Sequence, residues 1–220
     1  MGVEGTPLKL PWFRCASLWR ARPMTREGGI NMDFNQIVSR MIRAARLEVD
    51  LYEEVEADTE ATSQAIAAVV IAALASGIGS ALGSLFLRKG VAGFFGGLIL
   101  SPIMAVIGYF IWAFLTYFIG VNLFGGTADY GEMLRTIGFA YAPNVLRIAS
   151  FIPCVGWLVA LAGSIWALVA GVVAVRQALD FDTGKALLTC IIGWIIALIL
   201  SAMVSGALGL GAAGLSAPLR

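Results

Sequence analysis

The chain contains no histidine, and only three of its 220 residues are cysteine: Cys15, Cys154 and Cys190. The lack of histidine removes the commonest general base and the commonest metal ligand. No two cysteines have the CxxC spacing, so the sequence indicates neither a zinc site nor a disulfide framework. Charge is also scarce, at 13% of residues against about 25% in a typical soluble domain. We therefore expect no cofactor and no metal ion.

The formal net charge is +1 at pH 7, so the total charge does not indicate a nucleic-acid partner. A nucleic-acid surface of the usual kind needs a basic patch interleaved with aromatic residues. The sequence has no such patch, and we expect no nucleic-acid partner.

Apolar residues are abundant instead, at 59% of the chain. Several apolar runs exceed about 18 residues, the length that a membrane span needs. They lack the charged stripe at helical period that the helices of a soluble bundle require. The sequence predicts an all-α, polytopic membrane protein, a five-helix transmembrane bundle with an N-terminal amphipathic helix. The lipid bilayer is then its first partner.

The transmembrane domain is expected over residues 63–210, with a flexible tail at 211–220. Pro102 is expected to kink the second span, and Pro143 to break the third, because proline cannot donate a helical hydrogen bond. The five expected spans are residues 63–87, 91–120, 132–152, 154–178 and 186–208.

Residues 1–31 show no helical or strand period, and we expect a mis-assigned or disordered N-terminal extension, with translation starting at Met32. Residues 32–62 are expected to form an amphipathic, acidic, cytoplasmic helix, continuous over 33–60. Its first half has a basic stripe and could lie in the membrane interface. Its second half is acidic, and is either a solvated surface or a surface that docks a partner. The basic stripe consists of Arg40, Arg43 and Arg46.

Four glycines form two pairs with the spacing that lets helix backbones approach closely in lipid. The spacing fits packing within the chain, and it fits a homo-oligomer equally. The pairs are Gly79 with Gly83 and Gly93 with Gly97.

The third expected span contains the least ordinary polar residues. Asn144 and Arg147 follow the break at Pro143, where freed backbone groups need protein or water as partners. An ionisable residue at membrane depth is a functional candidate. Alternatively, Arg147 snorkels to the membrane surface from the end of a short helix.

Further polar residues lie in the turns on either side of this span. Asp180 and Asp182 have a spacing that can bind a divalent cation, but an N-cap at Asp182 is the simpler explanation. The candidate partner or polar-path residues are Asp129, Tyr130, Glu132, Arg135, Tyr141, Pro143, Asn144, Arg147, Asp180, Asp182 and Lys185.

The distribution of basic residues favours a cytoplasmic N-terminus under the positive-inside rule. With this orientation, the larger set of basic residues falls inside. The inside set is Arg40, Arg43, Arg46, Arg135, Arg176 and Lys185, and the outside set is Arg88, Lys89, Arg147 and Arg220.

A series of short motifs runs through residues 125–195. A polar, Gly-rich loop with Tyr130 and Glu132 precedes the sequence GFAYAPNVL at 138–146. The later motifs are Ile152-Pro153, Ile165-Trp166 and Gly184-Lys185-Ala186-Leu187. In this order and spacing, they resemble the Yip-one domain of the Ypt/Rab-interacting membrane proteins.

The resemblance implies a five-span, all-helical protein with a cytoplasmic N-terminus and no known catalytic chemistry. Eukaryotic members of that family work with Rab-type GTPases at Golgi and endoplasmic reticulum membranes, and bacterial members have no settled role. The start at Met32 and the short acidic helix after it look bacterial. We therefore expect an integral protein of a bacterial cytoplasmic membrane.

Two functions remain open. The first is a non-enzymatic scaffold or accessory subunit in membrane organisation or trafficking, with a membrane or cytoplasmic protein partner. The second is a small transporter or permease component with a polar path near residues 143–147. A transporter should have a polar cavity that reaches Arg147, whereas a scaffold should have a dry bundle with Arg147 at headgroup level. An intramembrane enzyme would need paired carboxylates within the membrane, and the acidic residues near these spans all lie at expected helix ends.

Overall fold

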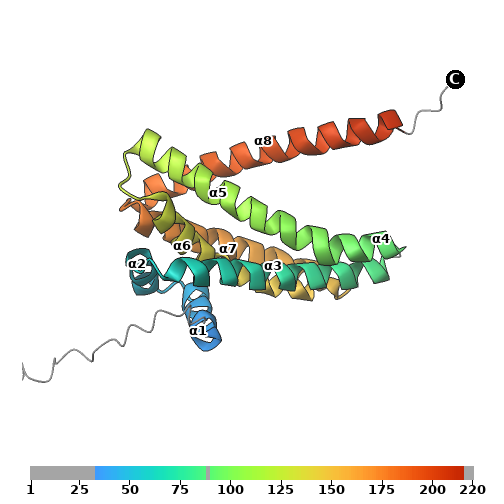
Figure 1. Cartoon of the computed structure of the whole chain (residues 1–220), viewed down its shortest axis with the longest axis horizontal. Helices are drawn as coiled ribbons and strands as arrows, with labels where there is room; N and C mark the ends of the chain where they lie inside the picture. The colour runs from blue at the N-terminus through green and yellow to red at the C-terminus, as the bar shows by residue number, and fades with distance from the viewer. Residues whose placement is uncertain (1–32, 88–89, 216–220) are drawn as a thin grey trace, which may run out of the picture. The chain divides into compact units, whose positions relative to one another are not determined.

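The computed structural model describes residues 33–87 and 90–215, so the predictions for residues 1–31 and for a start at Met32 lie outside the described part. The described chain is helical throughout, without a strand (Figure 1). Within these described ranges, four helices are long and apolar enough to cross a membrane: Ala61–Phe86, Gly90–Phe124, Gly156–Ala178 and Thr183–Leu200. The predicted all-α, polytopic fold is confirmed.

The first two of these helices form a closely packed pair. α3 is Ala61–Phe86, and the second apolar helix consists of α4 (Gly90–Phe95), the π-helix η2 (Gly96–Leu100) and α5 (Ser101–Phe124). The π-helical turn comes directly before Pro102, whose missing N–H disturbs the regular ladder there. The disturbance expected at Pro102 therefore takes the form of a π-helical turn.

The third expected span, residues 132–152, is not a single helix. It consists of α6 (Tyr130–Ala140) and a 3₁₀-helix, η3 (Ala142–Phe151), which meet just before Pro143. The broken backbone packs against α3, where Ser76 donates a 3.4 Å hydrogen bond to the carbonyl oxygen of Asn144. Protein atoms thus help to satisfy backbone groups that lipid could not.

The last two helices are α7 (Gly156–Ala178) and α8 (Thr183–Leu215). The tail expected from residue 211 is instead helical as far as Leu215. α8 meets α5 near its own N-terminal end, and the two helices then diverge (Figure 1).

Small residues let the helices of this bundle approach one another. A Cβ atom added at Gly79 would lie 2.5 Å from the carbonyl oxygen of Arg147, and one at Gly97 would lie 2.6 Å from the amide nitrogen of Ala81. A Cβ atom at Gly83 would lie 3.7 Å from the Cα atom of Phe151. These three glycines pack within the chain, and an oligomer through the Gly79–Gly83 and Gly93–Gly97 pairs stays a prediction.

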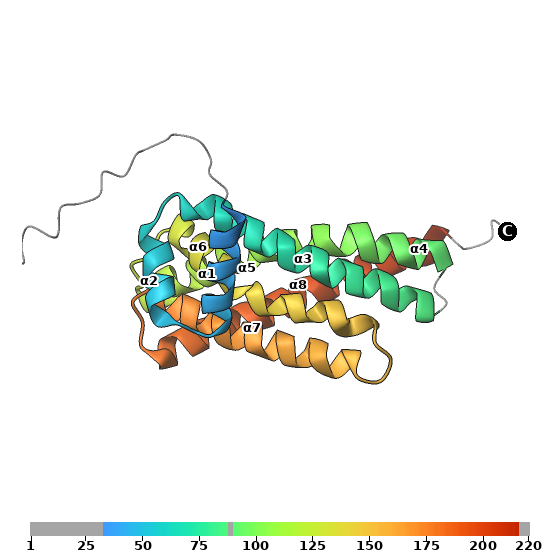
Figure 2. The same cartoon turned by 90° about the horizontal axis from the view of Figure 1, so that it is seen from below.

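The single helix expected over residues 33–60 is instead two helices, α1 (Phe34–Ala45) and α2 (Val49–Ala57). The chain turns between them at Leu47, whose φ angle of 61° ends the α-helical path. Figure 2 shows α1 running across the membrane helices instead of along them. The apolar face of α1, with Ile37, Met41 and Ala44, is buried against the bundle.

Candidate functional site

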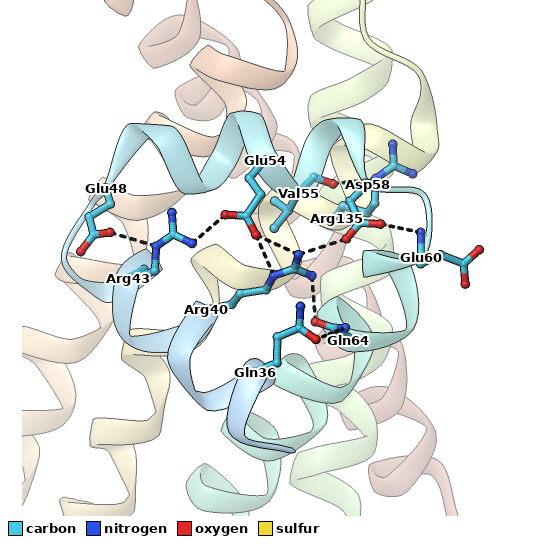
Figure 3. Close-up of polar contacts among 10 residues, drawn as sticks. All are labelled: Gln36, Arg40, Arg43, Glu48, Glu54, Val55, Asp58, Glu60, Gln64 and Arg135. Atoms are coloured by element: carbon cyan, nitrogen blue, oxygen red, sulfur yellow. Dashed lines mark hydrogen bonds and ion pairs between the residues drawn. The ribbon is translucent and has the colours of Figure 1, made fainter. Parts of the chain in front are cut away.

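Arg40 joins α1, α2 and α3 at one end of the bundle (Figure 3). Its guanidinium is buried and donates hydrogen bonds to Glu54 (2.8 Å) and Asp58 (3.0 Å), at the end of α2. A further 2.8 Å bond goes to Gln64 in the first turn of α3. A buried guanidinium is stable only when its donors find acceptors, and α2 and α3 supply them here.

Arg43, one helical turn after Arg40, extends this network toward solvent. It donates to Glu48 (3.0 Å) and to Glu54 (2.7 Å). Partial burial alone would raise the pKa of Glu54, but the hydrogen bonds from Arg43 and Arg40 outweigh that effect and lower it. Glu54 is therefore ionised at neutral pH and bridges the two arginines.

Arg135, one of the predicted partner or polar-path residues, holds α2 in place. It extends from α6 and donates to the carbonyl oxygens of Val55 (3.0 Å) and Glu56 (2.6 Å). These carbonyls belong to the last turn of α2, where helical hydrogen bonding runs out and a cation is favourable. The side chain is buried, so Arg135 contributes little exposed charge.

Three other predicted residues cap or brace helix ends. Asp129 and Glu132 form a capping box at the start of α6, with both hydrogen bonds at 2.7 Å. Asp182 accepts a 3.0 Å bond from the backbone N–H of Lys185 in the first turn of α8. In the described part of the chain, no group of three or more His, Cys, Asp or Glu residues could hold a metal ion.

Tyr130, Tyr141 and Lys185 lie against aromatic rings. Tyr130 packs edge-on against Tyr117 and donates a 3.3 Å hydrogen bond to the carbonyl oxygen of Phe110. Tyr141 stands edge-on to Tyr109, and the Lys185 ammonium lies 5.6 Å from the ring centre of Phe181. These contacts connect α5 with α6, and the α7–α8 turn with the start of α8.

A small acidic pocket of about 360 Å³ opens between α2, the start of α6 and the end of α7. Glu53 borders it and accepts a 3.1 Å hydrogen bond from Gln177 on α7. Burial raises the pKa of Glu56 to about 7, and the negative charges of Glu132 and Asp180 add to the effect. The sequence placed Glu132 and Asp180 at helix ends, and Glu53 and Glu56 in an acidic helix, but it could not show that these carboxylates meet.

Residues Tyr141, Asn144 and Arg147 line a larger groove of about 840 Å³ between α5, α6, η3, α7 and α8. Its walls are mostly apolar, and Arg147 is exposed. Pro143 is buried beside Gly163 of α7. Three of the predicted residues, Tyr141, Asn144 and Arg147, thus meet at one cavity, whereas Pro143 packs against α7.

Trp166 has a structural role that the sequence did not predict. Its indole N–H donates a 2.6 Å hydrogen bond to the carbonyl oxygen of Ala45, which ties α7 to the end of α1. The tryptophans Trp112 and Trp194 line the groove. Their positions in long apolar runs carried no signal, because lipid-facing and groove-facing tryptophans look alike in sequence.

Comparison with known proteins identifies a family. A family model described as the Yip1 domain matches residues 49–205, more than two thirds of the 220 residues. No curated protein and no solved structure matches the chain. The family match begins at the first residue of α2 and includes the α6–η3 break, and it confirms the resemblance drawn from residues 125–195.

Proposed function

The chain belongs to the Yip1 domain family and is an integral, multi-pass membrane protein, and we propose that it is a non-enzymatic scaffold or accessory subunit in membrane organisation or trafficking. Its docking surface is formed by α2, the start of α6 and the α7–α8 turn, which together we call the helical platform. The platform binds a membrane or cytoplasmic protein partner, and it faces the cytoplasm.

The observation that carries this proposal is the anchoring of α2. Arg40 holds α2 from α1, Arg135 holds it from α6, and Gln177 holds it from α7. Fixing a peptide segment costs about 1–2 kcal/mol of conformational entropy per residue. A helix that served only as a solvated linker would need no anchors from three other elements. A pre-ordered helix binds a partner without losing that entropy again.

The exposed surface of the platform is acidic. Asp50 and Glu53 are exposed on α2, and Glu132 and Asp180 lie around the adjacent pocket. A partner with basic residues would be attracted by this surface and oriented on it. The charges within the Arg40 and Arg43 network are already matched, so they are not free for such a partner.

Cross-linking of the full chain in native membranes, followed by mass spectrometry, tests the proposal. We expect a partner cross-linked through α2 or residues 122–135. The variant Asp50→Lys/Glu53→Lys should reduce its recovery about tenfold, the effect of about 1.4 kcal/mol of lost attraction. Arg147→Gln, in the groove, is the matched control and should leave recovery unchanged. The proposal of a docking platform would be contradicted if no partner is cross-linked, or if the double variant recovers as much partner as the unaltered chain.

A small transporter or permease component is the second candidate, and the groove at Arg147 is the observation that favours it. A path for a soluble ion needs polar walls, whereas these walls are mostly apolar. Anion flux into vesicles that contain the reconstituted chain, compared with the Arg147→Ala variant, decides this point. Flux that disappears with Arg147 would support the transporter over the scaffold.

A further inference from the structure

The groove runs along α7 from Leu161 to Gly171, with α5 on one side and α8 on the other. Ten residues of α-helix span about 15 Å. This length is half of the roughly 30 Å hydrocarbon core, which corresponds to one leaflet. Its volume of about 840 Å³ falls within the range of pockets that hold one organic ligand.

Arg147 lies at one end of this groove. The 3₁₀-helix η3 runs antiparallel to α7, because Gly163 approaches Pro143 and Leu146 while Gly156 approaches Ala149. Arg147 is therefore level with the first turns of α7, at the Leu161 end. On α3, its carbonyl oxygen faces Gly79, seven residues or about 10 Å before the helix ends at Phe86.

The cation at this end has no anionic partner in the part of the chain that the structure describes. None of the ion pairs among residues 33–87 and 90–215 involves Arg147. An unpaired guanidinium beside hydrocarbon is costly and normally finds a counter-charge. Asn144, whose side chain has amide donors, lines the same cavity.

We propose that the groove is a binding site for an anionic phospholipid of the surrounding bilayer. The lipid phosphate contacts the guanidinium of Arg147 and the amide of Asn144, and one acyl chain lies along α7 toward Gly171. Arginine suits this role because its planar fork of N–H donors matches phosphate oxygens. A soluble anion would gain the same charge contact but would leave the apolar walls at Ile107, Ile165 and Leu168 without a partner. This inference does not depend on the helical platform.

Glycines in the wall show where the groove can be filled without disturbing the bundle. Gly108 lines the groove, and a Cβ atom there would meet no heavy atom within 4 Å. Leucine at this position would project into the space assigned to the acyl chain. Gly96 has the same freedom but does not line the groove, so Gly96→Leu is the matched control.

Photoactivatable lipids test the site. The full chain is reconstituted into vesicles that contain a diazirine-labelled acyl chain on either phosphatidylglycerol or phosphatidylcholine, and the labelled peptides are mapped by mass spectrometry. We expect phosphatidylglycerol to label the groove segments of α5 and α7 about fivefold more than phosphatidylcholine, the preference that one basic residue confers. Arg147→Gln should reduce the ratio to about one, and Arg147→Lys should retain most of it.

Two further comparisons separate this site from general lipid contact. Arg176→Gln, which removes an exposed cation at the other end of α7, should leave the preference intact. Gly108→Leu should lower groove labelling by both lipids, and Gly96→Leu should not. Equal labelling by the two lipids in the unaltered chain would overturn the proposal, as would a preference that survives Arg147→Gln. Competition by millimolar inorganic phosphate would show a soluble-anion site and would also overturn it.

Discussion

At the scale of single residues, the arginines of this protein divide by their surroundings. Arg40 is 5% exposed and Arg135 is 6% exposed, and protein oxygen atoms satisfy both. Arg147 is exposed in the groove and has no carboxylate partner in the described chain. A buried, paired arginine positions helices, whereas an unpaired one at membrane depth is available to a ligand.

Glu56 should make the anchored position of α2 depend on pH. Burial and the charges of Glu132, Asp180 and Glu53 raise its pKa to about 7, although Arg135 opposes them. The folded carboxyl then holds its proton up to about pH 7, while the unfolded one loses it near its ordinary value of 4.5. Because the folded state binds the proton more tightly, stability should fall as pH rises from about 4.5 to about 7, and level off above.

Hydrogen exchange of α2 amides between pH 5 and pH 8, corrected for the intrinsic rate, measures this effect. Glu56→Gln should flatten the pH dependence of protection. Glu60→Gln removes an exposed carboxylate that does not border the acidic pocket, and it should leave the slope unchanged. An unaltered slope in Glu56→Gln would mean that another group is responsible.

At the scale of elements, apolar length predicted the bounds of the first, second and fourth spans to within a few residues, because the bilayer sets how long a spanning helix must be. The last helix runs from Thr183 to Leu215, beyond the expected 186–208. A disturbance at Pro102 and a break at Pro143 were also foreseeable, since proline cannot donate to a helix. The kink expected at Pro102 is replaced by a π-helical turn just before it. The α1–α2 turn was not, because Leu47 is neither glycine nor proline and yet has a positive φ angle. Local propensity carries no signal for a turn that tertiary contacts impose.

The candidate site was less accessible from sequence than the spans. Asn144 and Arg147 were recognised because polar residues after a proline stand out in an apolar run. The roles of Arg40 and Arg135 were not, because their acceptors come from elements distant in sequence. The groove forms where α5, α7 and α8 cross, and the hydrophobic periodicity of a sequence does not predict how its helices cross.

The packing of η3 on α3 should be sensitive to a single methyl group. A Cβ atom at Gly79 would lie 2.5 Å from the carbonyl oxygen of Arg147 and 2.8 Å from that of Ile148. These are backbone atoms, so Gly79→Ala must displace α3 or η3. We expect the free energy of unfolding to fall by about 2 kcal/mol or more. A Cβ atom at Gly108 meets open space, so Gly108→Ala should raise the free energy of unfolding by about 0.5–1 kcal/mol, because alanine has the higher helix propensity.

Unfolding of purified variants in mild detergent compares the two glycines. The midpoint of the unfolding transition should fall for Gly79→Ala, and it should rise or stay the same for Gly108→Ala. A Gly79→Ala protein as stable as the parent would show that η3 can move away from α3, so that the groove lined by Arg147 has an adjustable wall.

At the scale of the whole chain, the turns between the long helices lie at two opposite ends of the bundle. α2 hydrogen-bonds to α6 and to the end of α7, so the α7–α8 turn lies at the end where α2 lies. The turn between η3 and α7 lies at the other end, where Gly83 of α3 approaches Phe151. Figure 2 shows α1 and α2 at one end of the helices and the η3–α7 turn at the other. The side of the membrane that each end faces is then a single binary question.

Cys154 can answer that question. It is exposed in the η3–α7 turn, whereas Cys190 is buried in α8. With a cytoplasmic N-terminus, a membrane-impermeant maleimide should label Cys154 in intact cells carrying a Cys15→Ser chain. In a chain with Cys15→Ser, Cys154→Ser and Glu60→Cys, labelling should require permeabilised cells, because Glu60 lies at the start of α3 beside the platform. The reverse pattern would place the platform outside the cytoplasm. An acidic docking surface outside the cytoplasm could not bind a cytoplasmic partner. The partner would then lie on the outer side of the membrane.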